Sequence, residues 1–307
     1  MGGNQALDVN RNVFEHADVE INTHGSDWYF AVCAVMTVSL LGVVGTSFRK
    51  PSTHRIFHYI SSGILLTAAI AYFSMGSNLG QVPVQVEFVR PGNSHVRAAG
   101  TREIFWVRYV DWFITTPLLL TDLLLTAGMP WPSILIAILA DEAMVVCGLV
   151  GALVPTSYKW GYFTFGTVAF FYVVWAVVFE GRRHAAALGG SIYKTYLICG
   201  CMTIFLWFLY PISWGLCEGG NVISADGEAV FYGVLDLLAK PVFTALLLWG
   251  HRNIDPSALG LHIREAGMPQ GAIKKEHHSG DHGHIGEYNG NNTLASGNHQ
   301  AAATPAA

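Results

Sequence analysis

The stretch "VFYGVLDLLAKPVFTALLLW", residues 230–249, is apolar along its whole length except for Asp236 and Lys240. A helix of about 20 apolar residues is long enough to cross a hydrocarbon core of roughly 30 Å. A charged side chain at that depth is costly unless it is paired or hydrated. Asp236 and Lys240 stand four residues apart, which puts them on one face of a helix. The stretch therefore predicts a membrane-spanning helix that carries a buried acid–amine pair.

The rest of the chain has the same character. Of its 307 residues, 52% are hydrophobic and 12% are charged, whereas soluble proteins have about 25% charged residues. Apolar runs of spanning length cover approximately 27–48, 56–79, 104–126, 131–153, 160–180, 193–214 and 229–250. We therefore predict an all-α membrane protein, a bundle of seven transmembrane helices.

Three segments follow from this pattern. Residues 1–26 are polar and form an extracellular amino-terminal segment, and residues 27–252 form the bundle. Residues 253–307 are rich in Gly, Asn and His, bury too little apolar surface to fold alone, and are predicted to be a disordered cytoplasmic tail. In the one long linker, the alternating valines of residues 82–89 predict a small hairpin.

The distribution of Lys and Arg decides the orientation. The loops on one side contain Arg49, Lys50, Arg55, Arg182, Arg183, Lys194 and Arg252. The opposite side contains Arg11, Arg90, Arg97, Arg102 and Lys159. This bias predicts an amino terminus outside, a cytoplasmic carboxyl terminus, and a multi-pass protein of the plasma membrane.

Ionisable residues inside the spans are candidates for function. They are Arg108, Asp111, Asp122, Asp141, Glu142, Asp236 and Lys240. Lys240 alone among the six lysines lies well inside an apolar run. A buried amine can lose its proton, or it can become a covalent imine whose charge nearby carboxylates balance. Asp236 supplies such a counter-charge, and the alternative is a structural pair that joins two helices.

The third span adds two carboxylates on one face. Asp111 and Asp122 are eleven residues apart, close to three turns and about 16 Å along the axis. Arg108 lies one turn from Asp111 and can keep it ionised, whereas the leucines around Asp122 favour its protonated form. The pair is typical of stations on a proton path. The alternative is hydrogen bonding between helices through Thr115 and Thr116.

Aromatic residues suggest a ligand pocket. In "WFLYPISW", residues 207–214, Trp207, Tyr210 and Trp214 share one face. Trp112, next to Asp111, could form an opposite wall for a flat conjugated ligand tied to Lys240. An ordinary packed core is the alternative.

Taken together, "RYVDWFITTPLLLTD", "WFLYPISWG" and "LDLLAK" resemble three helices of the microbial (type 1) rhodopsins, and residues 27–252 follow the helix order of the bacteriorhodopsin-like pumps. The loops and the long tail resemble the fungal opsin branch. The resemblance implies all-trans-retinal bound covalently to Lys240 as a protonated Schiff base.

The resemblance also implies a role for each motif residue. Asp111 corresponds to the proton acceptor, Asp236 to the second counter-ion and Arg108 to the gating arginine. Asp122 corresponds to the cytoplasmic proton donor and Ser61 to its hydrogen-bond partner. The remaining members of the implied route are Thr115, the tyrosines Tyr72 and Tyr210 beside Asp236, and the release pair Glu218 and Glu228.

The implied pocket consists of Lys240, Tyr109, Trp112, Thr116, Leu119, Asp141, Met144, Gly148, Trp207, Tyr210, Pro211 and Trp214. Some positions depart from the family pattern. Phe163 and Phe170 replace other side chains, and Glu142 adds an acid that should point away from the ligand. Pro241 follows the lysine and lacks a backbone donor, which should loosen the last helix there.

Asp111, Thr115 and Asp122 together match outward proton pumps, so we expect a light-driven outward proton pump rather than an enzyme. The alternatives are a slow-cycling photosensory opsin that signals through its cytoplasmic side, an opsin-related chaperone without chromophore, and an unrelated transporter with a noncovalent substrate. Expected partners are retinal, protons, the lipid bilayer and further copies of the chain in a homo-oligomer, but no nucleic acid. The five cysteines lack metal-type spacing. The five histidines between His277 and His299 could bind a metal weakly, but a tail without fixed geometry favours solvated side chains, so no metal site is expected.

Overall fold

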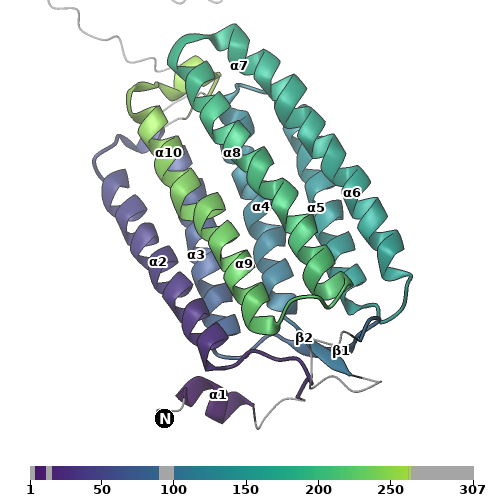
Figure 1. The fold of residues 1–307 in the computed structure, drawn as a ribbon. Coiled ribbons are helices and arrows are strands. Elements are labelled where there is room, and N and C mark those ends of the chain that lie inside the picture. Colours follow the sequence, from purple (N-terminus) through teal and green to yellow (C-terminus); the bar gives the residue numbers. More distant parts are fainter. Residues whose placement is uncertain (1–3, 12–15, 90–99, 262, 264–307) are drawn as a thin grey trace, which may run out of the picture. The chain divides into compact units, whose positions relative to one another are not determined.

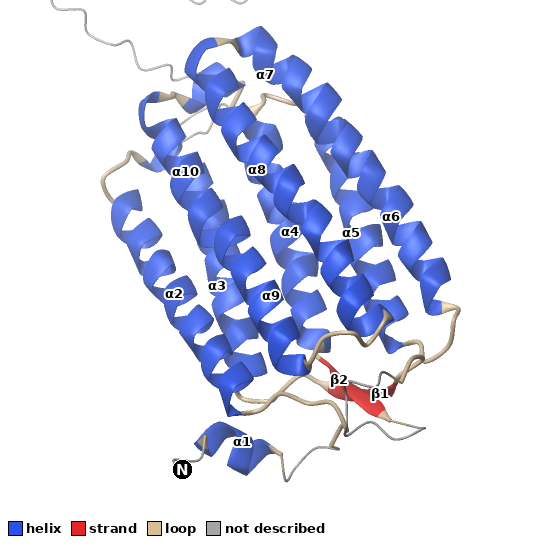
Figure 2. Ribbon diagram, in the orientation of Figure 1, coloured by secondary structure: helices blue, strands red, loops and turns tan. Residues whose placement is uncertain are grey.

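The structure is a computed structural model that describes residues 4–11, 16–89, 100–261 and 263. In the part of the chain up to residue 265, long helices stand side by side and a short helix, α1 (Gln5–Asn10), lies across one end (Figure 1). Figure 2 shows two strands at that same end. We call it the hairpin end, and we call the opposite end, where the described chain finishes, the tail end.

The long helices have the following bounds. Four are α2 (Thr23–Ser47), α3 (Ile56–Gly76), α4 (Trp106–Thr126) and α5 (Trp131–Leu153). Three more contain π-helical turns: α6 (Lys159–Trp175) continues through 176–181 into α7 (Arg182–Leu188), α8 (Gly190–Trp214) continues to 219, and α9 (Ala225–Leu237) continues through 238–242 into α10 (Phe243–Gly250). Six of the seven are long and apolar enough to cross a membrane, and α4 completes the bundle. The predicted seven-helix membrane fold is confirmed.

The outer faces of the bundle are apolar. Leu139 of α5, Phe165 and Val168 of α6, and Phe205 of α8 are all exposed. The charged residues of α4 lie inside instead, with Arg108, Asp111 and Asp122 fully buried. Large apolar side chains outside and charges inside are the pattern expected for a bundle surrounded by lipid.

The helix that begins with α6 is longer than the predicted span of 160–180. Residues 181–188, "GRRHAAAL", continue the helix although they are polar at their start. Hydropathy marks where a helix leaves the hydrocarbon, but Arg and Ala are good helix formers in water as well. The helix ends only at Gly189, whose φ of 67° is readily adopted by glycine.

The hairpin consists of β1 (Val82–Gln85) and β2 (Thr101–Ile104), paired antiparallel with Val82 opposite Ile104. This confirms the predicted hairpin, with its second strand just before α4. The amino-terminal segment adds to it, because the Val19 N–H donates to Thr101 O and the Glu103 N–H donates to Val19 O. The hairpin is therefore tied to the segment that precedes the first long helix.

Both predicted ends of the bundle need adjustment. The amino-terminal segment is not merely polar, because Leu7 is buried and α2 already begins at Thr23, where Asn22 caps it. At the other end, residues 254–261 are described, and Leu259 is buried against the bundle. A polar average over 253–307 conceals Leu259 and the partly buried Ile254 and Leu261, which pack against the same core. The histidines from His277 to His299 lie outside the described residues.

Glu103 of β2 predicts a pH effect on stability. Its side chain is buried, and burial raises its pKa from 4.5 to about 8 even though the Ile21 N–H donates to it. Between these two values the folded protein keeps a proton that the unfolded chain has lost. Stability should therefore be highest at the acidic end of this window and fall as the pH rises, by up to about 1.4 kcal/mol per pH unit. Thermal unfolding in detergent across this range should show the fall.

The matched variants are Glu103→Gln, which should remove the pH-dependent fall, and Glu87→Gln in the same linker, which should retain it. Equal slopes for wild type and Glu103→Gln would contradict the assignment.

Candidate functional site

The centre of the bundle contains one amine and two carboxylates. Lys240 Nζ lies 2.5 Å from Asp111 Oδ2 and 3.0 Å from Asp236 Oδ2. All three side chains are buried. A buried cation is tolerated only with close opposite charge and good hydrogen bonds, and this site supplies both from two different helices. The arrangement brings together the acid–amine pair of residues 230–249 and the first carboxylate of α4.

Lys240 lies in a distorted part of its helix. The turn 238–242 is π-helical and contains Pro241. Proline cannot donate a backbone hydrogen bond to the preceding turn, and single π turns occur frequently at functional sites. The turn agrees with the expectation that Pro241 loosens the helix beside the lysine.

The two carboxylates differ in their hydrogen bonds. Asp236 accepts from Tyr72 OH at 2.7 Å and from Tyr210 OH at 2.6 Å. Asp111 Oδ1 has no hydrogen-bond partner among the described residues, and Thr115 donates to the backbone carbonyl of Asp111 rather than to its carboxylate. Since hydrogen bonds to the charged form stabilise it, Asp236 is the better stabilised anion. Asp111 is the carboxylate better suited to accept a proton.

A cavity extends from Lys240 between α4, α5, α6 and α8. Its lining includes eleven predicted pocket residues, Tyr109, Trp112, Thr116, Leu119, Met144, Gly148, Trp207, Tyr210, Pro211, Trp214 and Lys240 itself. The twelfth, Asp141, lies behind the wall, where it accepts a hydrogen bond from Thr116 at 2.6 Å. The walls are mostly aromatic or aliphatic, with the hydroxyl side chains Thr116 and Thr167, and the charged residues of the lining are Asp236 and Lys240. The cavity thus fits a flat apolar ligand with one polar end at the lysine.

Part of this wall was not predicted from the sequence. Val145, Tyr162, Gly166 and Thr167 also line the cavity, together with Phe163, Phe170 and Ala239. Tyr162, Gly166 and Phe170 recur every four residues, so they share one face of α6. That spacing is readable in the sequence, but the charge of α6 stands at its first residue, Lys159, and no motif further along shows which face points inward.

Towards the tail end, Asp122 lies in a nearly apolar setting. Ser61 of α3 donates to Asp122 Oδ2 at 3.1 Å, and Oδ1 has no partner among the described residues. The surrounding Leu123 and Leu124 are fully buried. Thr126 and His251, which were not predicted, lie beyond it: Thr126 bonds both to the Asp122 carbonyl and to the His251 ring. A carboxyl without a cationic partner in this setting is suited to hold a proton.

Towards the hairpin end, Arg108 points away from Asp111. Its guanidinium pairs with Glu228 and donates to Tyr29 OH at 2.8 Å, and it lies 3.6 Å from Glu218. The direct partner of Asp111 is therefore Lys240 and not Arg108. The structure brings the predicted pair Glu218 and Glu228 into one buried cluster with Arg108.

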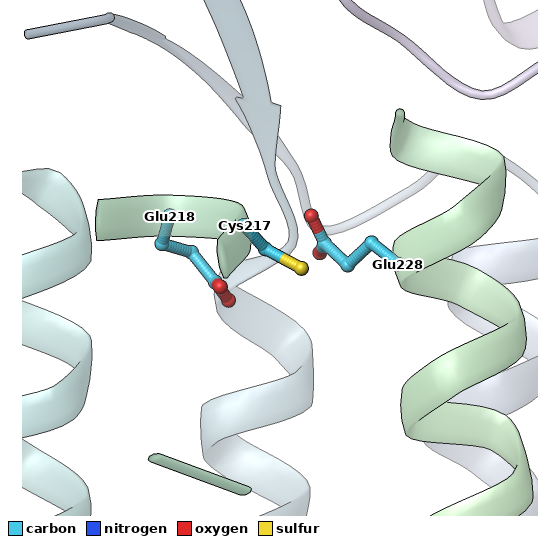
Figure 3. A group of neighbouring side chains, drawn as sticks. All are labelled: Cys217, Glu218 and Glu228. Atoms are coloured by element: carbon cyan, nitrogen blue, oxygen red, sulfur yellow. The ribbon is translucent and has the colours of Figure 1, made fainter. Parts of the chain in front are cut away.

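Arg102, Tyr29, Tyr232 and Cys217 also belong to this cluster and were not predicted as site residues. Figure 3 shows the Cys217 thiol between the carboxyls of Glu218 and Glu228. Their ligand-type atoms lie within 4.8 Å of one another, close enough to hold a metal ion. Glu228, however, already pairs with Arg102 and Arg108. Two guanidinium ions at one carboxylate oppose a further cation, so we assign no metal here.

Known proteins share the sequence and the fold of this chain. Residues 24–254 match the family of bacteriorhodopsin-like proteins. The chain is 60% identical over 265 residues to the opsin-like protein carO of Fusarium fujikuroi, with 85% of each chain covered.

Two solved structures are similar as well. One is the light-driven proton pump rhodopsin of Coccomyxa subellipsoidea, with 38% identity, a TM-score of 0.71, and coverage of 76% of this chain and 99% of that one. The other is the light-driven proton pump LR (Mac) from Leptosphaeria maculans, with 36% identity, a TM-score of 0.73, and coverage of 77% and 99%. The family match spans all seven helices of the bundle.

Proposed function

The chain belongs to the bacteriorhodopsin-like family, whose members are light-driven ion pumps rather than enzymes and carry a retinal chromophore, and we propose from this membership that it pumps protons outward across the plasma membrane. The observation that carries the proposal is the Lys240 amine held between Asp111 and Asp236 at one end of an apolar cavity. The similar structures from Coccomyxa and Leptosphaeria, both light-driven proton pumps, support the choice of ion.

In this proposal Lys240 Nζ holds retinal covalently, and Trp112, Trp207 and Trp214 contribute to the walls that orient it. When bound, retinal supplies a light-driven isomerisation that changes the proton affinity and the exposure of the nitrogen. The apolar walls exclude water, which strengthens the electrostatic interactions at the lysine. Tyr72 and Tyr210 donate to Asp236 and hold its carboxylate in place as the second counter-charge of the nitrogen.

The protein residues then divide the proton transfer. Asp111 lies 2.5 Å from the Lys240 nitrogen, its Oδ1 has no hydrogen-bond partner in the described part of the chain, and it accepts the proton. Asp122 is buried, and Ser61 is the hydrogen-bond partner of its carboxyl among the described residues; it returns a proton to the nitrogen from the tail side. Different surroundings give two carboxyls of one helix opposite tasks. Release takes place in the Glu218 and Glu228 cluster at the hairpin end.

The outward direction depends on the orientation of the bundle. Arg182 and Arg183 of α7 and Arg252 after α10 lie at the tail end, and loops rich in Lys and Arg stay in the cytoplasm. The hairpin end is then outside. Protons taken up near Asp122 and released near Glu218 would leave the cell.

The test is illumination of cells that express the chain and are supplied with retinal. We expect light to acidify the medium, and we expect a protonophore to abolish the change, because only net transport makes a gradient. A coloured protein that gives no acidification in light would overturn the pump assignment and favour the photosensory alternative.

A further inference from the structure

The hairpin inserts a second arginine into the outer cluster. Arg102 of β2 is buried, and its Nη2 lies 2.6 Å from Glu228 Oε2 while its Nε lies 3.2 Å from the same oxygen. Its remaining nitrogen, Nη1, donates to Asn221 Oδ1 at 2.8 Å and to Ile223 O at 2.7 Å. The guanidinium is therefore held on both sides, and its Nε and Nη2 both face the Glu228 carboxylate.

Glu228 consequently receives two cations. Arg102 occupies Oε2, and Arg108 of α4 occupies Oε1. Charge-assisted hydrogen bonds of this kind are about twice as strong as neutral ones. A proton on Glu228 would leave two buried guanidinium ions without their common anion, which is strongly unfavourable.

Glu218 has a different environment. Its Oε1 accepts from Tyr109 OH at 2.9 Å, and Tyr232 OH lies 3.2 Å from Oε2. Both donors are neutral phenols, and the nearest Arg108 nitrogen is 3.6 Å away. The Cys217 thiol lies between Glu218 and Glu228 (Figure 3). No hydrogen bond joins the two carboxyl groups among the described contacts. The geometry thus opposes a proton shared between the acids.

We propose that Arg102 is a positioning residue that holds Glu228 as a permanent carboxylate, so that the proton released at the outer surface leaves from Glu218 alone. The inference rests on the proposed pump function. In the step, the Glu218 carboxyl loses its proton to water, and Tyr109 and Tyr232 stabilise the resulting carboxylate. The proton that Asp111 accepted from Lys240 later moves outward and restores the Glu218 carboxyl.

The test follows proton release after a flash with a pH-indicating dye, on retinal-loaded protein in lipid vesicles. Glu218→Gln should lose prompt release and also lose the bleached carboxylic acid band in the infrared difference spectrum. The charge-compensated variant Arg102→Gln/Glu228→Gln removes one cation and one anion together. It should keep the bleached carboxylic acid band and release more protons promptly than Glu218→Gln does, because Glu218 is still present in a cluster of unchanged net charge.

A gain of signal tests Arg102 itself. In the Glu218→Gln background, Arg102→Gln should restore prompt release, because Glu228 can then hold a proton. Arg102→Lys in the same background should remain silent, because it retains the cation. A merely structural role for Arg102 would give no such recovery.

Each failure has its own meaning. Prompt release in Glu218→Gln alone, its loss in Arg102→Gln/Glu228→Gln, or silence in Arg102→Gln/Glu218→Gln would overturn the inference. The visible band of each variant reports whether it has folded around retinal. If the wild type itself is colourless or moves no protons in light, the proposed function fails instead.

Discussion

Lys240→Ala, supplied with retinal, should form no covalent pigment and show no visible band beyond that of free retinal. Lys240 is the lysine that lines the cavity, and its Nζ is the atom that can form the bond. The substitution also leaves Asp111 and Asp236 facing each other without their cation. Removing one partner of a buried ion pair costs about 3–5 kcal/mol, so the apoprotein should also unfold at a lower temperature.

Two variants separate the lost bond from the lost charge. Lys240→Arg keeps a cation between the carboxylates but cannot form the covalent link, so it should also be colourless while recovering part of the thermal stability. Lys159→Ala removes another buried lysine, whose Nζ donates to the Glu218 carbonyl, and it should stay coloured. A covalent visible pigment in Lys240→Ala would refute the assignment of the chromophore site.

The parts of the site that lie on one helix could be predicted from the sequence. Asp236 and Lys240 lie on one face of their helix, and Asp111 and Asp122 lie on one face of theirs. Which residues share a face follows from helical spacing, which is a local property. Contacts between helices could not be predicted in this way. That Ser61 bonds to Asp122, and Tyr72 to Asp236, followed from the resemblance to a family and not from spacing.

Arg102 shows why the remainder could not be predicted. In the sequence it is one of several loop charges that indicate orientation. Its partner Glu228 is 126 positions away along the chain, and the two meet because β2 lies at the end of the bundle where α9 begins (Figure 1). Loop charges carry no periodicity, so the burial of the Arg102 side chain could not be predicted from the sequence. Leu259 was missed because it lies with Ile254 and Leu261 in a stretch too short to alter the polar average of residues 253–307.

Asp122→Asn should slow the return of the proton to the Lys240 nitrogen by about two orders of magnitude, the lower end of what a positioned acid contributes. Asn has nearly the same shape and can still accept a hydrogen bond from Ser61, but it has no proton to give. The proton must then come from bulk water, so the rate should fall as the pH rises, which the wild type should not show. Flash absorption spectroscopy on retinal-loaded protein measures both effects.

Glu142→Gln is the matched control, because it removes a carboxyl of α5 that is half-buried and does not line the cavity. It should recover at the wild-type rate at every pH. Ser61→Ala should have a smaller effect than Asp122→Asn, since it removes one hydrogen bond at 3.1 Å and leaves the acid in place. If Asp122→Asn recovered at the wild-type rate, a proton would reach the Lys240 nitrogen from the tail side without a buried donor. The two carboxyls of α4 would then not have separate roles.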